Sequence, residues 1–169
     1  RGLAVPDGDH EVGTDEHVEL GGVEGKVVNI GARNDPYGTG LAELRAIVRD
    51  VTTGCDAPAD CIGDLVQAVD EAATNIIRYG YRGGPGEIDM TAELLGDDIV
   101  ITLEDRAPEF DPLTVPPPDL SIPPQHRKPG GMGVHLMRLA TDSIEHRSRP
   151  GGGNILTLTR SRVRRAKEG

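Results

Sequence analysis

The chain has 169 residues, 36% of them hydrophobic, which is the length and composition of one ordinary globular domain with its own core. A formal net charge of -10 and only four aromatic residues argue against a nucleic-acid or anionic-membrane surface, and no apolar run approaches the roughly 20 residues of a membrane span. Two cysteines are too few for a disulfide framework or a four-thiolate zinc site, so we expect free thiols. The first residues lack the apolar stretch of a signal peptide, so we expect a cytoplasmic protein.

The first third of the chain predicts an arm, a strand and a helix. Residues 1–22 are rich in aspartate, glutamate and glycine without periodicity, so they are expected to form a mobile acidic arm. Valine and isoleucine then indicate a strand over residues 24–30. Apolar residues at helical spacing between Thr39, a cap residue, and Gly54, a stop, predict a helix.

A second helix is predicted from Asp60, as its N-cap, to Tyr79, with Gly80 ending it. One narrow stripe of this helix is apolar and must face the core. The stripe consists of Leu65, Val69, Ala72 and Ile76.

The second half of the chain predicts a sheet interrupted by an irregular segment. Alternating apolar residues over 88–94 and 99–103 indicate an antiparallel hairpin. Residues 106–130 contain eight of the thirteen prolines, which forbid a regular helix or central strand and suggest a lid (this segment is called the lid below).

After the lid, a short helix through about residue 142, strands over 143–148 and 155–160, and a basic tail at 162–169 complete the chain. The sum is an α+β fold of two layers, with helices grouped together against a mixed sheet.

Three side chains share a second stripe of the helix that begins near residue 60. Glu71, Asn75 and Arg78 are four and three residues apart, so they are neighbours on its surface. A carboxylate, an amide oxygen and a guanidinium in a row suit a phosphate–magnesium site. Taken alone, the same stripe also fits a solvated helix face with ordinary charge pairing.

Two further places could meet a ligand. Asp105 ends a strand beside a loop, where a carboxylate can accept a hydrogen bond from the amine of adenine, although it also fits a plain strand end before a proline turn. Gly131 and Gly133 open a helix whose backbone N–H groups favour an anion. Arg127 and Lys128 just before them could reach a phosphate, or could be exposed charges.

The order of these motifs resembles the Bergerat-fold ATP-binding domain that gyrase, histidine kinases and mismatch-repair ATPases share. Residues 71–81, Glu-Ala-Ala-Thr-Asn-Ile-Ile-Arg-Tyr-Gly-Tyr, resemble its N box, and their form is similar to that of bacterial anti-sigma factor serine/threonine kinases. The segments at 105–112, 130–136 and 152–158 resemble the adenine box, the glycine box and the last strand. The resemblance implies one ATP-binding domain over residues 23–161, with helices on one face of a mostly antiparallel sheet.

The resemblance also implies roles for individual residues. Glu71 would be the catalytic base, and Asn75 would bind the Mg²⁺ that accompanies ATP. Asp105 would bind the adenine amine, followed by Ala107 where the family normally has glycine. The remaining nucleotide contacts would come from Arg78, Arg127, Lys128, Gly131, Gly133, Val134 and Thr157.

Such a protein would phosphorylate a serine or threonine of an anti-anti-sigma protein of the STAS type, and its other partner would be a sigma factor. The resemblance leaves a homodimer open. A second hypothesis is a non-catalytic binding module that holds a sigma factor or related regulator, with nucleotide acting only as a gating ligand; Ala107 favours it.

Overall fold

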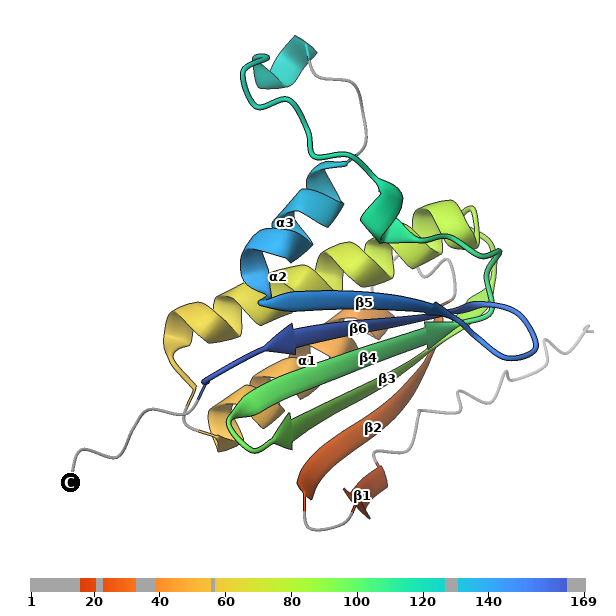
Figure 1. Cartoon of the computed structure of the whole chain (residues 1–169). Coiled ribbons are helices and arrows are strands. Elements are labelled where there is room, and N and C mark those ends of the chain that lie inside the picture. The colour runs from red at the N-terminus through yellow and green to blue at the C-terminus, as the bar shows by residue number, and fades with distance from the viewer. Residues whose placement is uncertain (1–15, 21–22, 33–38, 56, 127–130, 164–169) are drawn as a thin grey trace, which may run out of the picture.

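The structure is a computed structural model, shown in Figure 1, and it describes residues 16–20, 23–32, 39–55, 57–126 and 131–163. Within that part of the chain, six strands form one sheet in the order β1-β2-β3-β4-β6-β5. The strands are β1 (Glu16–Leu20), β2 (Val23–Ala32), β3 (Gly86–Leu95), β4 (Asp98–Asp105), β5 (Ser143–Ser148) and β6 (Asn154–Arg160). Every described pair is antiparallel, so the sheet is antiparallel rather than mixed, and the hairpin predicted from 88–103 is confirmed.

The first strand differs from the sequence-based expectation. The range 1–22 was expected to be a mobile arm, but β1 lies inside it and pairs with β2, placing Glu16 opposite Val27. An edge strand gains its hydrogen bonds from the neighbouring backbone, so it needs no apolar alternation that a sequence pattern would reveal. Residues 1–15, and residues 164–169 of the expected basic tail, lie outside the described residues.

Three helices lie on one face of the sheet (Figure 1). They are α1 (Thr39–Gly54), α2 (Ala59–Asn75) and α3 (Met132–Ala140). The predicted apolar stripe of α2 faces the core: Leu65, Val69 and Ala72 are at most 2% exposed, and Ile76 is partly buried against them. The inward residues of β3 and β4 complete this core, because alternate residues of a strand point to the same face. The α+β fold with two layers is therefore confirmed.

Both ends of α2 differ from the predicted ones. Pro58, and not Asp60, is the N-cap; a proline costs little at a helix start because the first N–H groups have no helical partner. Asp60 lies in the first turn, where its carboxylate accepts a hydrogen bond from the Cys61 amide at 3.0 Å. At the other end, the helix widens after Asn75 into a π-turn, Ile76–Gly80, which sequence periodicity over five residues does not reveal.

The described part of the lid, residues 106–126, is irregular apart from two short 3₁₀ turns, Pro112–Thr114 and Pro124–His126. In Figure 1 it leaves the end of β4, passes the end of β5 and rises beyond the start of α3. Arg138 of α3 secures its first part by donating to the carbonyl oxygens of Leu113 and Val115, at 3.0 and 3.1 Å. Among the described helices, none is both long enough and apolar enough to cross a membrane.

Candidate functional site

A cavity of about 230 Å³ opens between α2 with its π-turn, the adjoining ends of β4 and β6, the start of the lid, and α3. Its walls are mostly apolar, and a few polar groups converge on it, which is the usual make-up of a small-molecule site. The described lining comprises Ala72, Asn75, Ile76, Tyr79, Gly80, Arg82, Asp105, Ala107, Pro108, Glu109, Phe110, Pro112, Met137, His146, Asn154 and Leu156.

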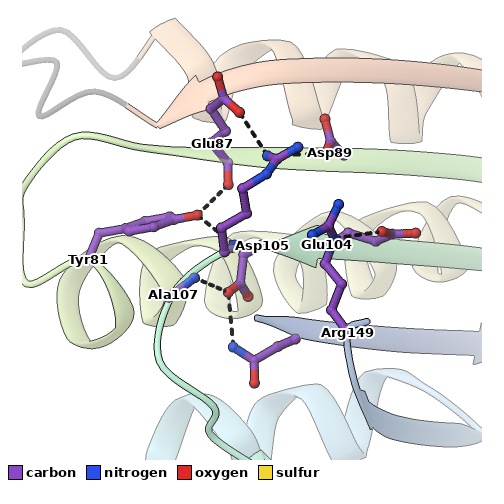
Figure 2. A network of polar contacts seen from close by, with 9 residues as sticks. Tyr81, Glu87, Asp89, Glu104, Asp105, Ala107 and Arg149 are labelled. Carbon is purple, nitrogen blue, oxygen red and sulfur yellow. Dashed lines mark hydrogen bonds and ion pairs between the residues drawn. The ribbon is translucent and has the colours of Figure 1, made fainter. Parts of the chain in front are cut away.

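Asp105 is the buried carboxylate of this cavity. It is the last residue of β4 and is 2% exposed. Its Oδ1 accepts two hydrogen bonds, from the Ala107 amide at 2.8 Å and from Asn154 Nδ2 at 2.9 Å (Figure 2). Since both described bonds fall on Oδ1, Oδ2 is left for a ligand in the cavity that Asp105 lines.

Burial raises the pKa of Asp105 above its usual value, because the charged form loses hydration. The hydrogen bonds from Asn154 and Ala107 act in the opposite direction and favour the carboxylate. The outcome is an acceptor group held in a largely dry environment, where a hydrogen bond to a ligand discriminates more strongly than it would in water.

Ala107 fits its position because Gly80 has no side chain. A Cβ atom added at Gly80 would lie 2.8 Å from the Ala107 methyl carbon, so the two residues pack closely. Ala107 is 3% exposed while its amide donates to Asp105. The π-turn therefore provides the space for the methyl group that distinguishes this chain from the expected glycine.

Glu71 and Asn75 lie on α2 facing the start of α3. A Cβ atom added at Gly133 would lie 2.6 Å from Glu71 Oε2 and 3.4 Å from Asn75 Nδ2, so only glycine leaves both side chains their places. Gly131 is the N-cap of α3 with a φ of 80°, a conformation that glycine adopts without strain. Gly133 and two residues of the predicted helix stripe, Glu71 and Asn75, thus meet, and Asn75 also lines the cavity.

The oxygens of Glu71 and Asn75 are the hard donors that Mg²⁺ prefers. In the described residues, no group of three or more histidine, cysteine, aspartate or glutamate side chains could hold a metal ion. A magnesium ion here would accordingly need oxygens from its own ligand, as it does when it accompanies a nucleotide. The donor set fits a metal that arrives with phosphates.

Other predicted contacts lie elsewhere. Arg78 is exposed on the π-turn and is not among the residues that line the cavity. The Val134 side chain is 4% exposed and belongs to the core, which leaves its backbone as the part that could contact a ligand. Arg127 and Lys128 lie outside the described residues.

Thr157 was expected near the adenine end, but it lies in the middle of β6 opposite Thr102, with their Oγ1 atoms 3.5 Å apart. Asn154 and Leu156 face the cavity, and alternation along a strand turns residue 157 to the other face of the sheet. Asn154, and not Thr157, is therefore the β6 residue that lies beside Asp105.

Sequence reasoning did not assign Asn154, His146 or Tyr81 to the site. The Tyr81 hydroxyl donates to the Glu87 carbonyl at 2.6 Å and accepts from the Arg106 amide at 2.9 Å, which anchors the chain just after Asp105 (Figure 2). Sequence offers only a weak signal for such residues, because each contact depends on which strands become neighbours.

Comparison with known proteins gives matches over most of the chain. The model of the family described as histidine kinase-like ATPase domain matches residues 38–160. A serine-protein kinase RsbW from a strain of Bacillus cereus is 30% identical over 109 residues, which are 62% of this chain and 68% of the relative. An anti-sigma F factor from Thermoanaerobacter pseudethanolicus is 28% identical over 116 residues, or 69% and 81% of the two chains.

Among solved structures, the RsbU and RsbW domains of a Mycobacterium tuberculosis protein match with a TM-score of 0.53 and 21% identity. The match covers 82% of this chain, which spans about a third (33%) of that longer chain. At this identity the similarity is one of fold.

Proposed function

Because the chain belongs to the histidine kinase-like ATPase domain family, and within it to the anti-sigma factor serine/threonine kinases, we propose that it binds ATP with Mg²⁺ and phosphorylates an anti-anti-sigma protein. The nucleotide would occupy the cavity beneath the lid. The phosphorylated residue would be a serine or threonine of a STAS-type protein, and a sigma factor would be the second partner.

One observation carries this proposal. A buried carboxylate, Asp105, lines the same cavity as Asn75, and Asn75 lies with Glu71 against Gly133 at the start of α3. A ligand that extends from an amine-bearing ring to a chain of phosphates matches this arrangement of an acceptor, an apolar cavity and a helix N-terminus.

At the base end, Asp105 Oδ2 accepts a hydrogen bond from the exocyclic amine of adenine. Guanine presents a carbonyl oxygen at that position, which a carboxylate repels. Two donors already hold Oδ1, so the side chain cannot easily turn to accommodate the other base.

At the phosphate end, Asn75 would hold the magnesium ion through its side-chain oxygen. The ion neutralises charge on the phosphate groups when it is bound. The backbone N–H groups at the start of α3, near Gly131 and Gly133, would meet the phosphates, and Arg78, Arg127 and Lys128 would supply positive charge.

Transfer requires a deprotonated hydroxyl in line with the γ-phosphate. Glu71 takes the proton of the substrate hydroxyl. At the same time the hydroxyl oxygen forms a bond to the γ-phosphorus, and the bond from that phosphorus to the leaving ADP oxygen breaks. Gly133 leaves room for the Glu71 carboxylate, which supports this role. The chain contributes mainly positioning and charge stabilisation.

The test combines radiolabelled ATP with purified STAS-type proteins from the same organism. We expect label on one of them with the wild type, and a loss of about a hundredfold or more with Glu71→Gln while calorimetry still detects ATP binding. Asn75→Ala should instead weaken ATP binding in the presence of Mg²⁺. Binding without transfer to any of these proteins would support the non-catalytic binding module, and absence of ATP binding by the wild type would refute both.

A further inference from the structure

Asn154 has a side-chain amide whose four described contacts use all of its hydrogen-bonding capacity. Its Nδ2 donates to Asp105 Oδ1 at 2.9 Å and to the Pro108 carbonyl at 3.3 Å. Its Oδ1 accepts from the Phe110 amide at 2.8 Å and lies 3.0 Å from His146 Nε2. The residue is 6% exposed, so these contacts are made in place of water.

The partners of Asn154 determine which way its amide points. Asp105 and Pro108 offer only acceptors, and the Phe110 amide offers only a donor, so Nδ2 must face the first two and Oδ1 the third. His146 Nε2 faces Oδ1 and therefore carries a proton, whether the imidazole is neutral or charged. His146 is thus a hydrogen-bond donor and the fourth partner of the Asn154 side chain.

The other side of the imidazole faces the lid. His146 Nδ1 lies 3.8 Å from Asp111 Oδ1, and the His146 side chain is 7% exposed. The same Asp111 oxygen accepts from the Leu113 amide at 2.8 Å and so caps the 3₁₀ turn Pro112–Thr114. One ring consequently touches both the residue that holds Asp105 and the residue that begins the first turn of the lid.

We propose that His146 is a positioning residue: through Asn154 it holds Asp105 in its base-binding orientation, and its ring packs beside Asp111 at the start of the lid. This inference rests on the proposed nucleotide binding. The carboxyl torsion of an aspartate is intrinsically broad, so the direction of Oδ2 depends on what holds Oδ1. A donor on Asn154 Oδ1 fixes and polarises the amide that does so.

Two substitutions of His146 separate the effect of its hydrogen-bond donor from the effect of the volume of its ring. Gln places a side-chain amide about where His146 Nε2 lies and can donate to Asn154, whereas Leu fills the space without a donor. Ser148→Ala is the matched control: the Ser148 backbone pairs with Asn154 across the two strands, but its Oγ donates to Glu109 of the lid and makes no described hydrogen bond to the Asn154 side chain.

Calorimetry then measures ATP and GTP affinity for each protein. We expect His146→Leu to raise the Kd for ATP about tenfold, the worth of one buried hydrogen bond, and to lower the preference for ATP over GTP. His146→Gln should restore most of both values, and Ser148→Ala should stay within about threefold of the wild type. A purely structural role would lower stability without changing the preference between the two bases.

A second measurement needs no nucleotide. In NMR spectra of the ligand-free protein, the side-chain amide protons of Asn154 should exchange slowly in the wild type and in His146→Gln, and faster in His146→Leu. If the wild type binds ATP but His146→Leu keeps its affinity, base preference and slow exchange, this inference is refuted while the proposed function stands. If the wild type binds no ATP, the proposed function fails first.

Discussion

Asp105 is the residue at which stability and function oppose each other. Its carboxylate is buried, and burial raises its pKa in the folded chain above the value in the unfolded chain. A group of this kind contributes most to stability at acid pH, below its unfolded pKa, and that contribution is lost as the pH rises through the window up to the raised folded pKa. Above that window the ionised Asp105 costs stability, and the proposed contact with adenine gives a reason to retain it.

Replacing Asp105 by Asn separates these two effects. The amide oxygen can still accept from Ala107 and Asn154, but the amide nitrogen then turns toward the cavity and meets the amine of adenine donor to donor. We expect the Kd for ATP to rise about thirtyfold or more, whereas the thermal midpoint of the ligand-free variant at pH 7 stays at or above that of the wild type. Calorimetry measures the Kd, and thermal unfolding of the same sample measures the midpoint. A midpoint below that of the wild type would contradict the conclusion that the buried charge of Asp105 lowers stability.

At the scale of elements, α2 and α3 build the phosphate end together. Glu71 and Asn75 come from the last turns of α2, and Gly133 comes from the first turn of α3. The two helices approach so closely that the Glu71 carboxylate occupies the space that any larger residue at 133 would need. The neighbouring atom is the end of a flexible side chain, so a methyl group there would displace Glu71 rather than unfold the helix.

Gly133→Ala should therefore impair transfer without harming the fold. Alanine favours a helix over glycine by up to about 1 kcal/mol, so the free energy of unfolding should be unchanged or higher. With Glu71 pushed aside, we expect transfer of phosphate to fall about tenfold or more. Urea unfolding and the radiolabel assay measure the two quantities.

Gly63→Ala provides the comparison for that variant. It makes the same change in α2, where an added Cβ meets nothing within 4 Å. This second variant should gain similar stability and keep full transfer. Equal transfer by the two variants would mean that Glu71 is not displaced or does not act as the base.

At the scale of the whole molecule, the strand order assembles the base end. Because β6 lies between β4 and β5, residue 105 is brought to residues 154 and 146, which lie far from it along the chain. The register places Asp105 opposite Asn154 and Ser148 opposite Asn154 on the other side. Gly153, at the turn into β6, has a φ of 109° and packs directly against the backbone of Asp105.

Gly153→Ala should disturb this register. A Cβ there would overlap the Asp105 backbone in a conformation that L-residues rarely adopt, so we expect a loss of about 2 kcal/mol or more in the free energy of unfolding. Gly151 has a φ of 86°, but an added Cβ there would meet open space. Gly151→Ala should therefore lower the free energy of unfolding by only about 1 kcal/mol, from backbone strain. Urea unfolding of the two variants gives the difference; equal losses would show that the contact with β4 is unimportant.

Much of the fold followed from local patterns. The apolar stripe of α2, the hairpin of β3 and β4, the last two strands and the proline-rich lid each depend on residues close together in the chain, so composition and periodicity were enough to predict them. The approach of Gly133 to Glu71 and Asn75 also followed, because the order of the motifs resembled a known family. β1 and the π-turn could not be predicted from local patterns, since neither needs a distinctive run of side chains.

The residues around Asp105 could not be predicted from such local patterns. The chain indicated a carboxylate at a strand end, and the family resemblance gave that carboxylate an adenine-binding role. The resemblance also placed Thr157 near the adenine end, whereas Asn154 and His146 were left unassigned. The neighbours of a strand residue depend on register and on which face the side chain points to, and a shift of one residue reverses that face. The pairing of β4 with β6, which joins segments far apart in the chain, and the register of the β5–β6 hairpin set these relations.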